Sequence, residues 1–185
     1  MISFREDISQ KEKIILIQNI YKEPIPLNYI SDSWGTTNIS NINSVNDINL
    51  IMSKSWLTGF IEAEGSFFYV KKDTNRIVHS FGLTQKLDPI VLISIKYYLH
   101  INSNVKFNGS AINNYYILET SNSRNIEYIR LSHFFSDKND NSKFLGVKSF
   151  EFKVWKRTYR KFKGNFTRLE KIRLWINKLR NKHKI

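Results

Sequence analysis

One nine-residue segment, residues 57–65, brings together small side chains, two carboxylates and a final glycine on what we expect to be a helix. Gly59 and Ala63 are four residues apart and share one helix face, where small side chains let a second helix backbone approach closely. Glu62 and Glu64 follow at the C-terminal end, where the helix dipole disfavours negative charge. The segment therefore predicts a helix that needs a second helix beside it and a cation near its end.

Two such helices packed side by side would bring carboxylates from each into one small region. Like charges that close need a cation to coexist, and oxygen ligands suit Mg²⁺, which can clamp the attacking and leaving oxygens of a phosphodiester. Gly65, directly after the second acid, predicts a left-handed cap that ends the helix. The alternative for so short a segment is an ordinary helix that ends in solvated acids.

The pattern after this helix alternates pairs of strands with helices. Two β-rich runs, 66–72 and 76–86, are joined by a short turn and predict a hairpin. Asp88 is placed to cap a helix over 90–99, since Pro89 is tolerated in a first turn. From residue 53 we expect the order α-β-β-α-β-β-α, an α+β domain, with a second strand pair at 105–108 and 115–120, a third helix to about residue 135, and two basic helices at 149–162 and 165–182.

A chain of 185 residues with 41% hydrophobic residues is long enough for one domain with a full core. Residues 1–50 differ from the rest, because Pro24 and Pro26 precede an Asn- and Ser-rich stretch without helical or strand periodicity. We interpret 1–50 as a leader and linker, in part helical over 11–21, and 51–185 as the folded domain. The chain has no Cys, which excludes disulfides and thiolate zinc sites.

The charge of the chain is strongly positive, with 29 Lys and Arg against 16 Asp and Glu, a net +13. The region from Lys148 onward holds 14 of the basic residues and two acidic ones, which gives it +12 of that charge. A nucleic acid is the expected partner, and we assign Lys161 and Lys163 to phosphate contacts; the alternative is a solvated helix face. No window reaches the roughly 18 consecutive apolar residues of a membrane-spanning helix, so we expect no membrane partner.

The nine-residue segment also matches a known consensus. The run LTGFIEAEG, from Leu57 to Gly65, fits LAGLIDADG at every position by residue type, the departures being Ala to Thr, Leu to Phe and both Asp to Glu. The chain therefore resembles the LAGLIDADG homing endonuclease family, single-motif type, and the resemblance extends through 81–89 and 146–151 to cover about residues 53–180. It implies an αββαββα domain whose four-stranded antiparallel sheet forms a DNA-binding saddle, followed by C-terminal helices.

The same resemblance implies the site residues. Glu64, the second acid of the motif, corresponds to the family's metal ligand, and we assign Ala63 to the same metal site, for Mg²⁺ or Mn²⁺. Gln85 resembles the polar residue that helps to order metal-bound or attacking water. Lys148 resembles the basic residue beside the scissile phosphate, where a cation stabilises developing negative charge. Gly59 and Ala63 would form the dimer interface.

Alternation along the hairpin separates two faces of the expected sheet. We expect the face with Phe67 and Phe81 to pack under the helices and the other face to lie in the DNA major groove. That second face carries Phe68 and Val78, which cannot make bidentate contacts to base edges, so a sheet covered by protein on both sides is the alternative. We interpret His79 as a packed or surface histidine rather than a metal ligand. The residues assigned to nucleic acid on this face are Lys72, Arg76, Ser80, Lys106, Asn108 and Tyr115.

The function implied is a site-specific double-strand DNA endonuclease, a homing endonuclease that hydrolyses phosphodiester bonds with divalent metal. One motif supplies half of an active site, so we expect a homodimer on a pseudo-palindrome or a second LAGLIDADG subunit, unless the chain is the second half of a two-motif protein. Two alternatives stay open: an intron maturase that binds RNA, and a non-catalytic nucleic-acid-binding or ribonucleoprotein component. The amino-acid composition is rich in Asn, Ile and Lys, which suits an AT-rich genome. With the family resemblance, this favours a gene in an organelle intron and an intracellular, mitochondrial location.

Overall fold

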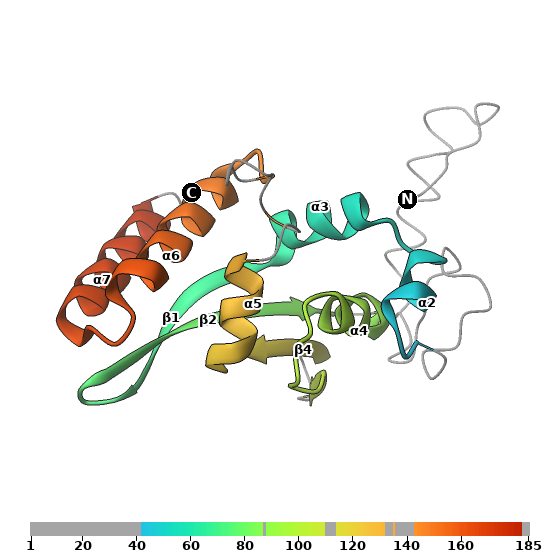
Figure 1. Ribbon diagram of the computed structural model, residues 1–185, viewed down its shortest axis with the longest axis horizontal. Coiled ribbons are helices and arrows are strands. Elements are labelled where there is room, and N and C mark those ends of the chain that lie inside the picture. Colours follow the sequence, from blue (N-terminus) through green and yellow to red (C-terminus); the bar gives the residue numbers. More distant parts are fainter. Residues whose placement is uncertain (1–41, 87, 110–113, 132–134, 136–142, 183–185) are drawn as a thin grey trace.

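The computed structural model describes residues 42–86, 88–109, 114–131, 135 and 143–182. The expected leader up to residue 41, with its helix, lies outside the described residues. The described part is an α+β fold in which helices cover one antiparallel sheet (Figure 1). The fold class expected from the sequence is confirmed.

The end of the expected linker differs from the prediction, because residues 42–50 belong to the folded core. Ser44 caps a short helix, α2 (Val45–Asn49), in a reciprocal capping box with Asp47. Ile42 and Ile48 are buried in the hydrophobic core. A capping box and two buried side chains are enough to fix this segment, although it is too short to show helical periodicity.

The sheet contains four antiparallel strands in the order β1-β2-β4-β3. The expected hairpin is formed by the first two strands, and the second pair lies beside it through pairing of β2 with β4. The strands are β1 (Ser66–Asp73), β2 (Arg76–Gln85), β3 (Lys106–Gly109) and β4 (Asn114–Thr120).

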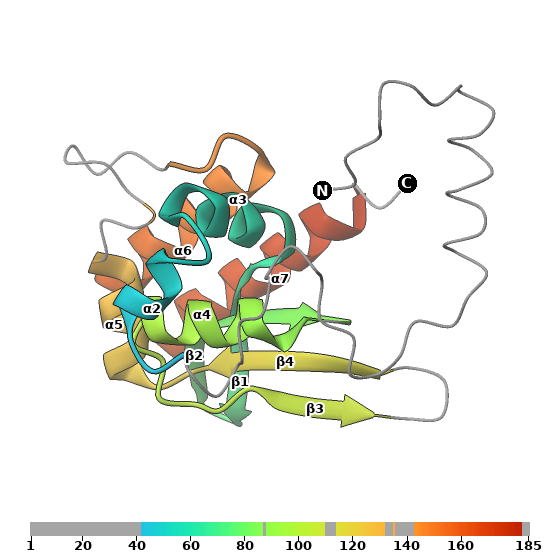
Figure 2. The same ribbon diagram turned by 90° about the vertical axis from the view of Figure 1, so that its right-hand side faces the viewer.

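The helices are α3 (Lys54–Glu64), α4 (Pro89–Tyr98), α5 (Ser123–Leu131), α6 (Val147–Phe162) and α7 (Phe166–Lys182). Both views show α3 and α6 on the same side of the sheet (Figures 1 and 2). Asp88 does not act as the expected side-chain cap, since its backbone is left-handed (φ 55°) and it makes no capping hydrogen bond. None of the described helices is long and apolar enough to cross a membrane.

Phe67 lies at the centre of an aromatic core. It is the second residue of β1, it is almost fully buried, and it follows the end of α3 by three positions. Aromatic rings pack around it with centroid separations of 4.9 to 5.9 Å, and they come from Phe81, Phe135, Phe144, Phe152 and Trp155. Because a buried aromatic side chain removes roughly 150 to 250 Å² from water, this packing fixes the start of β1 and the helix end before it.

His79 is buried on the helix side of β2, so of the two expected placements, packed or on the surface, the packed one is correct. Its Nε2 lies 3.0 Å from the hydroxyl of Thr158, which is also 2.8 Å from the hydroxyl of Tyr69. The Thr158 hydroxyl donates to the Trp155 carbonyl at 2.9 Å, so it accepts from the other two groups, which assigns the Nε2–H tautomer to His79. Burial, followed by the charge of Lys163, lowers the pKa of His79 to about 3.

Candidate functional site

The motif helix α3 buries one side and leaves the other exposed. Leu57 and Ile61 are fully buried, whereas Gly59 and Ala63 lie on the exposed side. Apart from its own helix, no described heavy atom lies within 4 Å of a Cβ placed on Gly59. In the described part of this chain, the small-residue face is therefore open to a second helix.

Gly65 ends α3 in a different way from the one expected. Its backbone is extended (φ −69°, ψ 151°), so it is not a left-handed cap. A Cβ at this position would lie 2.5 Å from the carbonyl oxygen of Ile61 and 2.8 Å from its Cγ2. The glycine is required because the chain passes close to the last helical turn on its way into β1, and this tight exit leaves Glu64 at the helix–strand junction.

The two acids of the motif have different surroundings. The Oε1 atom of Glu62 accepts hydrogen bonds from the backbone N–H groups of Leu145 (2.7 Å) and Gly146 (2.5 Å). Gly146 is the N-cap of α6, where the helix dipole favours a carboxylate. Glu64 is exposed and makes no hydrogen bond or ion pair with the described residues. Glu62 therefore fastens α3 to the start of α6, and Glu64 is available to a ligand.

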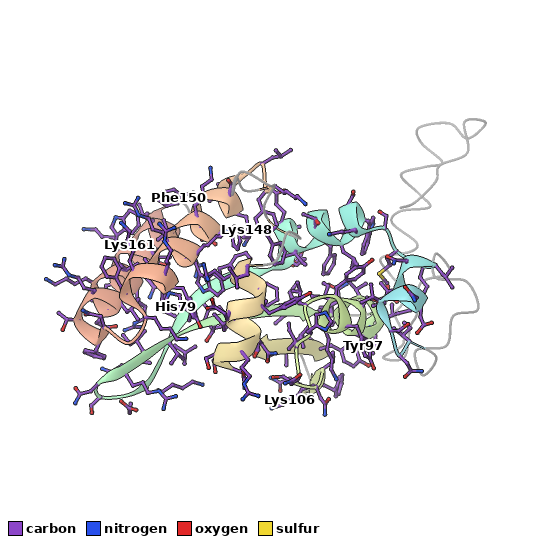
Figure 3. The ribbon with its side chains drawn as sticks, in the orientation of Figure 1. His79, Tyr97, Lys106, Lys148, Phe150 and Lys161 are labelled. Atoms are coloured by element: carbon purple, nitrogen blue, oxygen red, sulfur yellow. The ribbon has the colours of Figure 1, made fainter. Side chains whose placement is uncertain are left out.

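Lys148 lies at the end of the motif. It is in the first turn of α6, and its ammonium donates a hydrogen bond to the carbonyl oxygen of Gly65. Figure 3 shows it between α6 and α3. The ammonium also lies 3.7 Å from Glu151 Oε2, and 18% of the Lys148 side chain is exposed. Two segments 83 residues apart are thus joined at the residue that follows Glu64.

Gln85 lies at the end of β2, beyond the start of β1. Ser66 pairs with Gly82, so Gln85 is about 10 Å further along β2, at roughly 3.3 Å per residue. It is half-buried and shares the helix-facing side of the strand with Leu83. No hydrogen bond within the described residues joins Gln85 to Glu64 or Lys148. The structure thus brings Lys148 to the motif and leaves Gln85 nearby on the sheet.

Three of the residues that we assigned to nucleic acid lie together on β3 and β4. Lys106 and Asn108 are exposed, and strand pairing places Tyr115 opposite Asn108. The Asn108 amide donates to the Tyr115 hydroxyl at 2.6 Å, so the two side chains present one polar surface. Lys72 and Arg76 are also exposed, at the far end of the β1–β2 hairpin.

Ser80 was expected on this face and the structure places it elsewhere: it is fully buried, and its hydroxyl has no hydrogen-bond partner among the described atoms. Its pairing partner on β1 is Phe68, whose ring extends over the neighbouring Gly82. Alternation placed Ser80 on the side of the strand opposite Phe81 but could not show that this position is buried. Ser80 is therefore not available to nucleic acid.

The basic residues at the end of α6 lie near the hairpin rather than near β3. Lys161 and Lys163 are exposed, and the Lys163 ammonium lies 4.7 Å from the Tyr159 ring centroid. The Lys71 ammonium of β1 lies 5.5 Å from the ring of Phe166, which begins α7. This contact joins the α6–α7 turn to the hairpin, whereas Lys106 is well separated from Lys161 (Figure 3).

The donor atoms at the end of α3 fit a hard divalent cation. Glu64 offers an exposed carboxylate, and Ala63 has only its backbone carbonyl to offer, one of the last carbonyls of a helix, which lack intrahelical partners. Carboxylate and carbonyl oxygens are ligands that Mg²⁺ and Mn²⁺ accept. In the described part of the chain, no three His, Asp or Glu residues form a complete metal cluster. A cation here would thus share Glu64 and Ala63 with further oxygen ligands.

A family model described as LAGLIDADG endonuclease matches residues 57–159 of the sequence. The chain belongs to the LAGLIDADG endonuclease family. The matched region begins at the fourth residue of α3 and ends in α6, so it contains the motif, the whole described sheet and Lys148. The family assignment therefore rests on the same residues that form the site.

Similar proteins include the "Probable intron-encoded endonuclease Cox1-I1b" of Schizosaccharomyces pombe, which is 39% identical over 135 residues. That alignment covers 71% of this chain and 33% of the relative, so the chain spans about a third of the relative's length. Two solved structures of lysine-to-alanine mutants of I-SmaMI, a LAGLIDADG homing endonuclease, match with TM-scores of 0.52 and 0.51 at 20% and 19% identity. Both matches cover 92% of this chain, against 52% and 53% of theirs, and at this identity they show a shared fold.

Two features of this LAGLIDADG chain were not found from its sequence. The contact of Glu62 with α6 joins residues more than 80 positions apart, and no local pattern indicates it. The contact of Glu151 with Lys148, in contrast, could have been predicted, because the two residues are three positions apart on a helix and side chains at that spacing are neighbours. The other partner of Glu151, Arg180, lies on α7 and could be located only from the packing of α6 and α7.

Proposed function

We propose that this chain supplies one half of a site-specific double-strand DNA endonuclease that hydrolyses phosphodiester bonds with a divalent metal. The observation that carries the proposal is the end of α3. There, the exposed Glu64 carboxylate adjoins an open small-residue face, and Lys148 is bound to the carbonyl of the next residue. A carboxylate that can bind the cation, a lysine ammonium for the phosphate and a surface for the second half of the endonuclease thus lie together.

Each residue of the site has a physical task in this proposal. Glu64 and the carbonyl of Ala63 would hold Mg²⁺ or Mn²⁺, which supplies positive charge to the reacting phosphate. The ammonium of Lys148 stabilises negative charge that develops on that phosphate. Gln85, further along β2, orients the attacking water through its amide.

The second half of the site comes from another motif helix on the open face of α3, in a homodimer or with a second LAGLIDADG subunit. The exposure of Gly59 and Ala63 supports this, since a Leu at position 59 would project into the space that the second backbone needs. Sedimentation should therefore show self-association of the parent protein that Gly59→Leu weakens. A parent that stays monomeric at micromolar concentrations and with DNA would exclude the homodimer.

The expected partner is double-stranded DNA, bound by the polar surface of β3 and β4 and by the basic hairpin and α6 ends. The name of the Schizosaccharomyces pombe relative supports an intron origin. The high content of Asn, Ile and Lys suits an AT-rich genome, and together with an intron origin it favours a mitochondrial location.

A cleavage selection on randomised duplex DNA with Mg²⁺ tests the proposal. We expect enrichment of one long target cut on both strands, with no product when Mg²⁺ is removed by a chelator. If the folded protein cuts no duplex but binds structured RNA more tightly than DNA, the nuclease proposal is wrong and an intron maturase is favoured. Equal, weak binding to both would favour a non-catalytic nucleic-acid-binding role.

A further inference from the structure

Three side chains connect the end of the motif helix to the last helix of the chain. Lys148 donates to the carbonyl of Gly65, and its ammonium lies 3.7 Å from Glu151 Oε2. The Oε1 atom of Glu151 accepts from Arg180 Nε at 2.7 Å. Arg180 Nη2 donates in turn to the carbonyl of Phe67 at 3.2 Å. The contacts therefore begin at the last residue of the motif and end two residues after it, at the start of β1.

Glu151 is the centre of this network and its least exposed charged group. Its side chain is 12% exposed, against 18% for Lys148 and 32% for Arg180. Its Oε2 atom is buried and has no hydrogen-bond partner within the described residues, because the Lys148 ammonium is slightly too distant. A buried carboxylate oxygen costs free energy unless it is paired. Lys148 compensates it by charge, so the two residues hold each other in place.

We infer that Glu151 is a positioning residue for Lys148, and that Arg180 holds Glu151 in the orientation this requires. The inference rests on the proposed function, in which Lys148 acts on the reacting phosphate. A lysine ammonium sits on a flexible four-carbon stem, so a fixed anion beside it restricts its position further than the Gly65 carbonyl does alone. Glu151 provides that anion from the next turn of α6. Because Arg180 lies on α7, the network also joins the basic C-terminal helix to the reaction centre.

The position of Lys148 can be measured without cleavage. Brief acetylation with acetic anhydride, followed by peptide mass spectrometry, gives a modification rate for each lysine. Glu151→Gln preserves side-chain size and removes the charge, so Lys148 should be acetylated several-fold faster. The matched control is Glu170→Gln, which removes the same charge from another Arg pair on α7, Glu170–Arg173 at 2.7 Å, and should leave the Lys148 rate unchanged. An unchanged Lys148 rate in folded Glu151→Gln would overturn the inference.

Arg180→Gln tests the same link if Glu151→Gln does not fold. This substitution leaves the carboxylate but removes the group that orients it. Lys148 should again be acetylated faster than in the parent, by a smaller factor. The same rate as in the parent, in a variant whose circular dichroism is unaltered, would show that Arg180 and Glu151 do not position Lys148.

Cleavage of a selected duplex then distinguishes positioning from general stabilisation. At saturating DNA, Glu151→Gln should lower the single-turnover rate roughly ten- to a hundredfold with unchanged affinity in Ca²⁺. Combined with Lys148→Met, it should cause no further loss, because Glu151 acts through Lys148. Additive losses, or an affinity loss as large as the rate loss, would contradict the inference. A parent that cuts no DNA contradicts the proposed function, and acetylation then decides on the positioning alone.

Discussion

Glu62 and Glu64 are two residues apart, and the geometry of one helix gives them separate tasks. At about 100° per residue, their side chains point about 200° apart around α3. One direction leads to the start of α6, where two N–H groups bind Glu62. The other leads away from the described chain, where Glu64 is exposed. A single acidic motif can therefore contain one structural carboxylate and one that is available to a ligand.

Glu64→Gln should preserve the fold and DNA binding and abolish cleavage. The amide is nearly isosteric, and Glu64 has no partner among the described residues to lose, so the melting temperature should not change. In the proposed function, loss of the negative charge removes a ligand of the metal that acts on the reacting phosphate. The measurement is nicking and double-strand cutting in Mg²⁺, with binding followed in Ca²⁺.

The matched control for this prediction is Glu62→Gln. It should weaken the charged hydrogen bonds to Leu145 and Gly146 and lower the free energy of unfolding by about 1 to 2 kcal/mol, while the folded protein still cuts. Undiminished cutting by Glu64→Gln would refute the assignment of Glu64 to the metal. Loss of cutting in both variants without a difference in stability would remove the distinction between the two acids.

His79 should make the protein less stable as the pH falls below 6.5. The pKa of this group is about 3 in the folded protein and 6.5 when unfolded, so between these values the unfolded chain binds a proton that the folded chain does not. Stability is thus fully present above pH 6.5 and should fall by about 1.4 kcal/mol for each pH unit below it. Urea unfolding between pH 7 and 5, where most carboxylates stay ionised, measures this slope. The slope should be smaller in His79→Gln, and an equal slope would exclude His79 as its source.

At the scale of the elements, periodicity and turn residues predicted those features of helices and strands that depend on residues close in the sequence. The spacing of Gly59 and Ala63 predicted that they share one face of the motif helix, and the structure buries Leu57 and Ile61 on the opposite side. The hairpin also has the expected inward face, with Phe67 opposite Phe81 and both almost fully buried. Alternation is sufficient here because a one-residue slip would reverse every side chain.

Features that depend on distant contacts could not be predicted in this way. Ser80 is fully buried on the side of the sheet that was expected to be open, and α2 is held by a capping box and core contacts in a segment with no periodic pattern. Gly65 was correctly expected to end α3, but for the wrong reason, since the requirement is the approach to Ile61 rather than a positive φ. The metal role of Glu64 depends on the second half of the site, so it stays a prediction.

Gly65→Ala should therefore destabilise the junction between α3 and β1. The added Cβ would meet a backbone oxygen at 2.5 Å, which must move, and such overpacking costs about 1 to 3 kcal/mol. The matched control is Gly59→Ala, where no described atom outside the helix is within 4 Å and the better helix propensity should add about 1 kcal/mol of stability. Urea denaturation measures both. A Gly65→Ala variant as stable as Gly59→Ala would show that the junction has room to relax.

At the scale of the whole molecule, the candidate site and the exposed lysines of α6 lie at different places that are joined by α6. The site is at the end of α3, while the exposed Lys161 and Lys163 are at the far end of α6, beside the hairpin. Phosphate contacts there would bind and orient a duplex without touching the reacting group. Changes at the two places should therefore affect different measurements: cleavage rate for the site, and salt-dependent affinity for the basic end.

The salt dependence of DNA binding tests this separation. If Lys161 and Lys163 each neutralise one phosphate of B-DNA, replacing both with Ala should make the slope of log affinity against log salt shallower by about 1.8, at about 0.9 per phosphate. The reason is that each lost contact leaves one counterion bound to the DNA. The control is Lys54→Ala with Lys96→Ala, which removes the same charge from α3 and α4 and should change the slope less. Fluorescence anisotropy from 50 to 300 mM salt, in Ca²⁺, gives the slopes; equal slopes for the parent and the Lys161/Lys163 variant would mean that this end of α6 is only a solvated face.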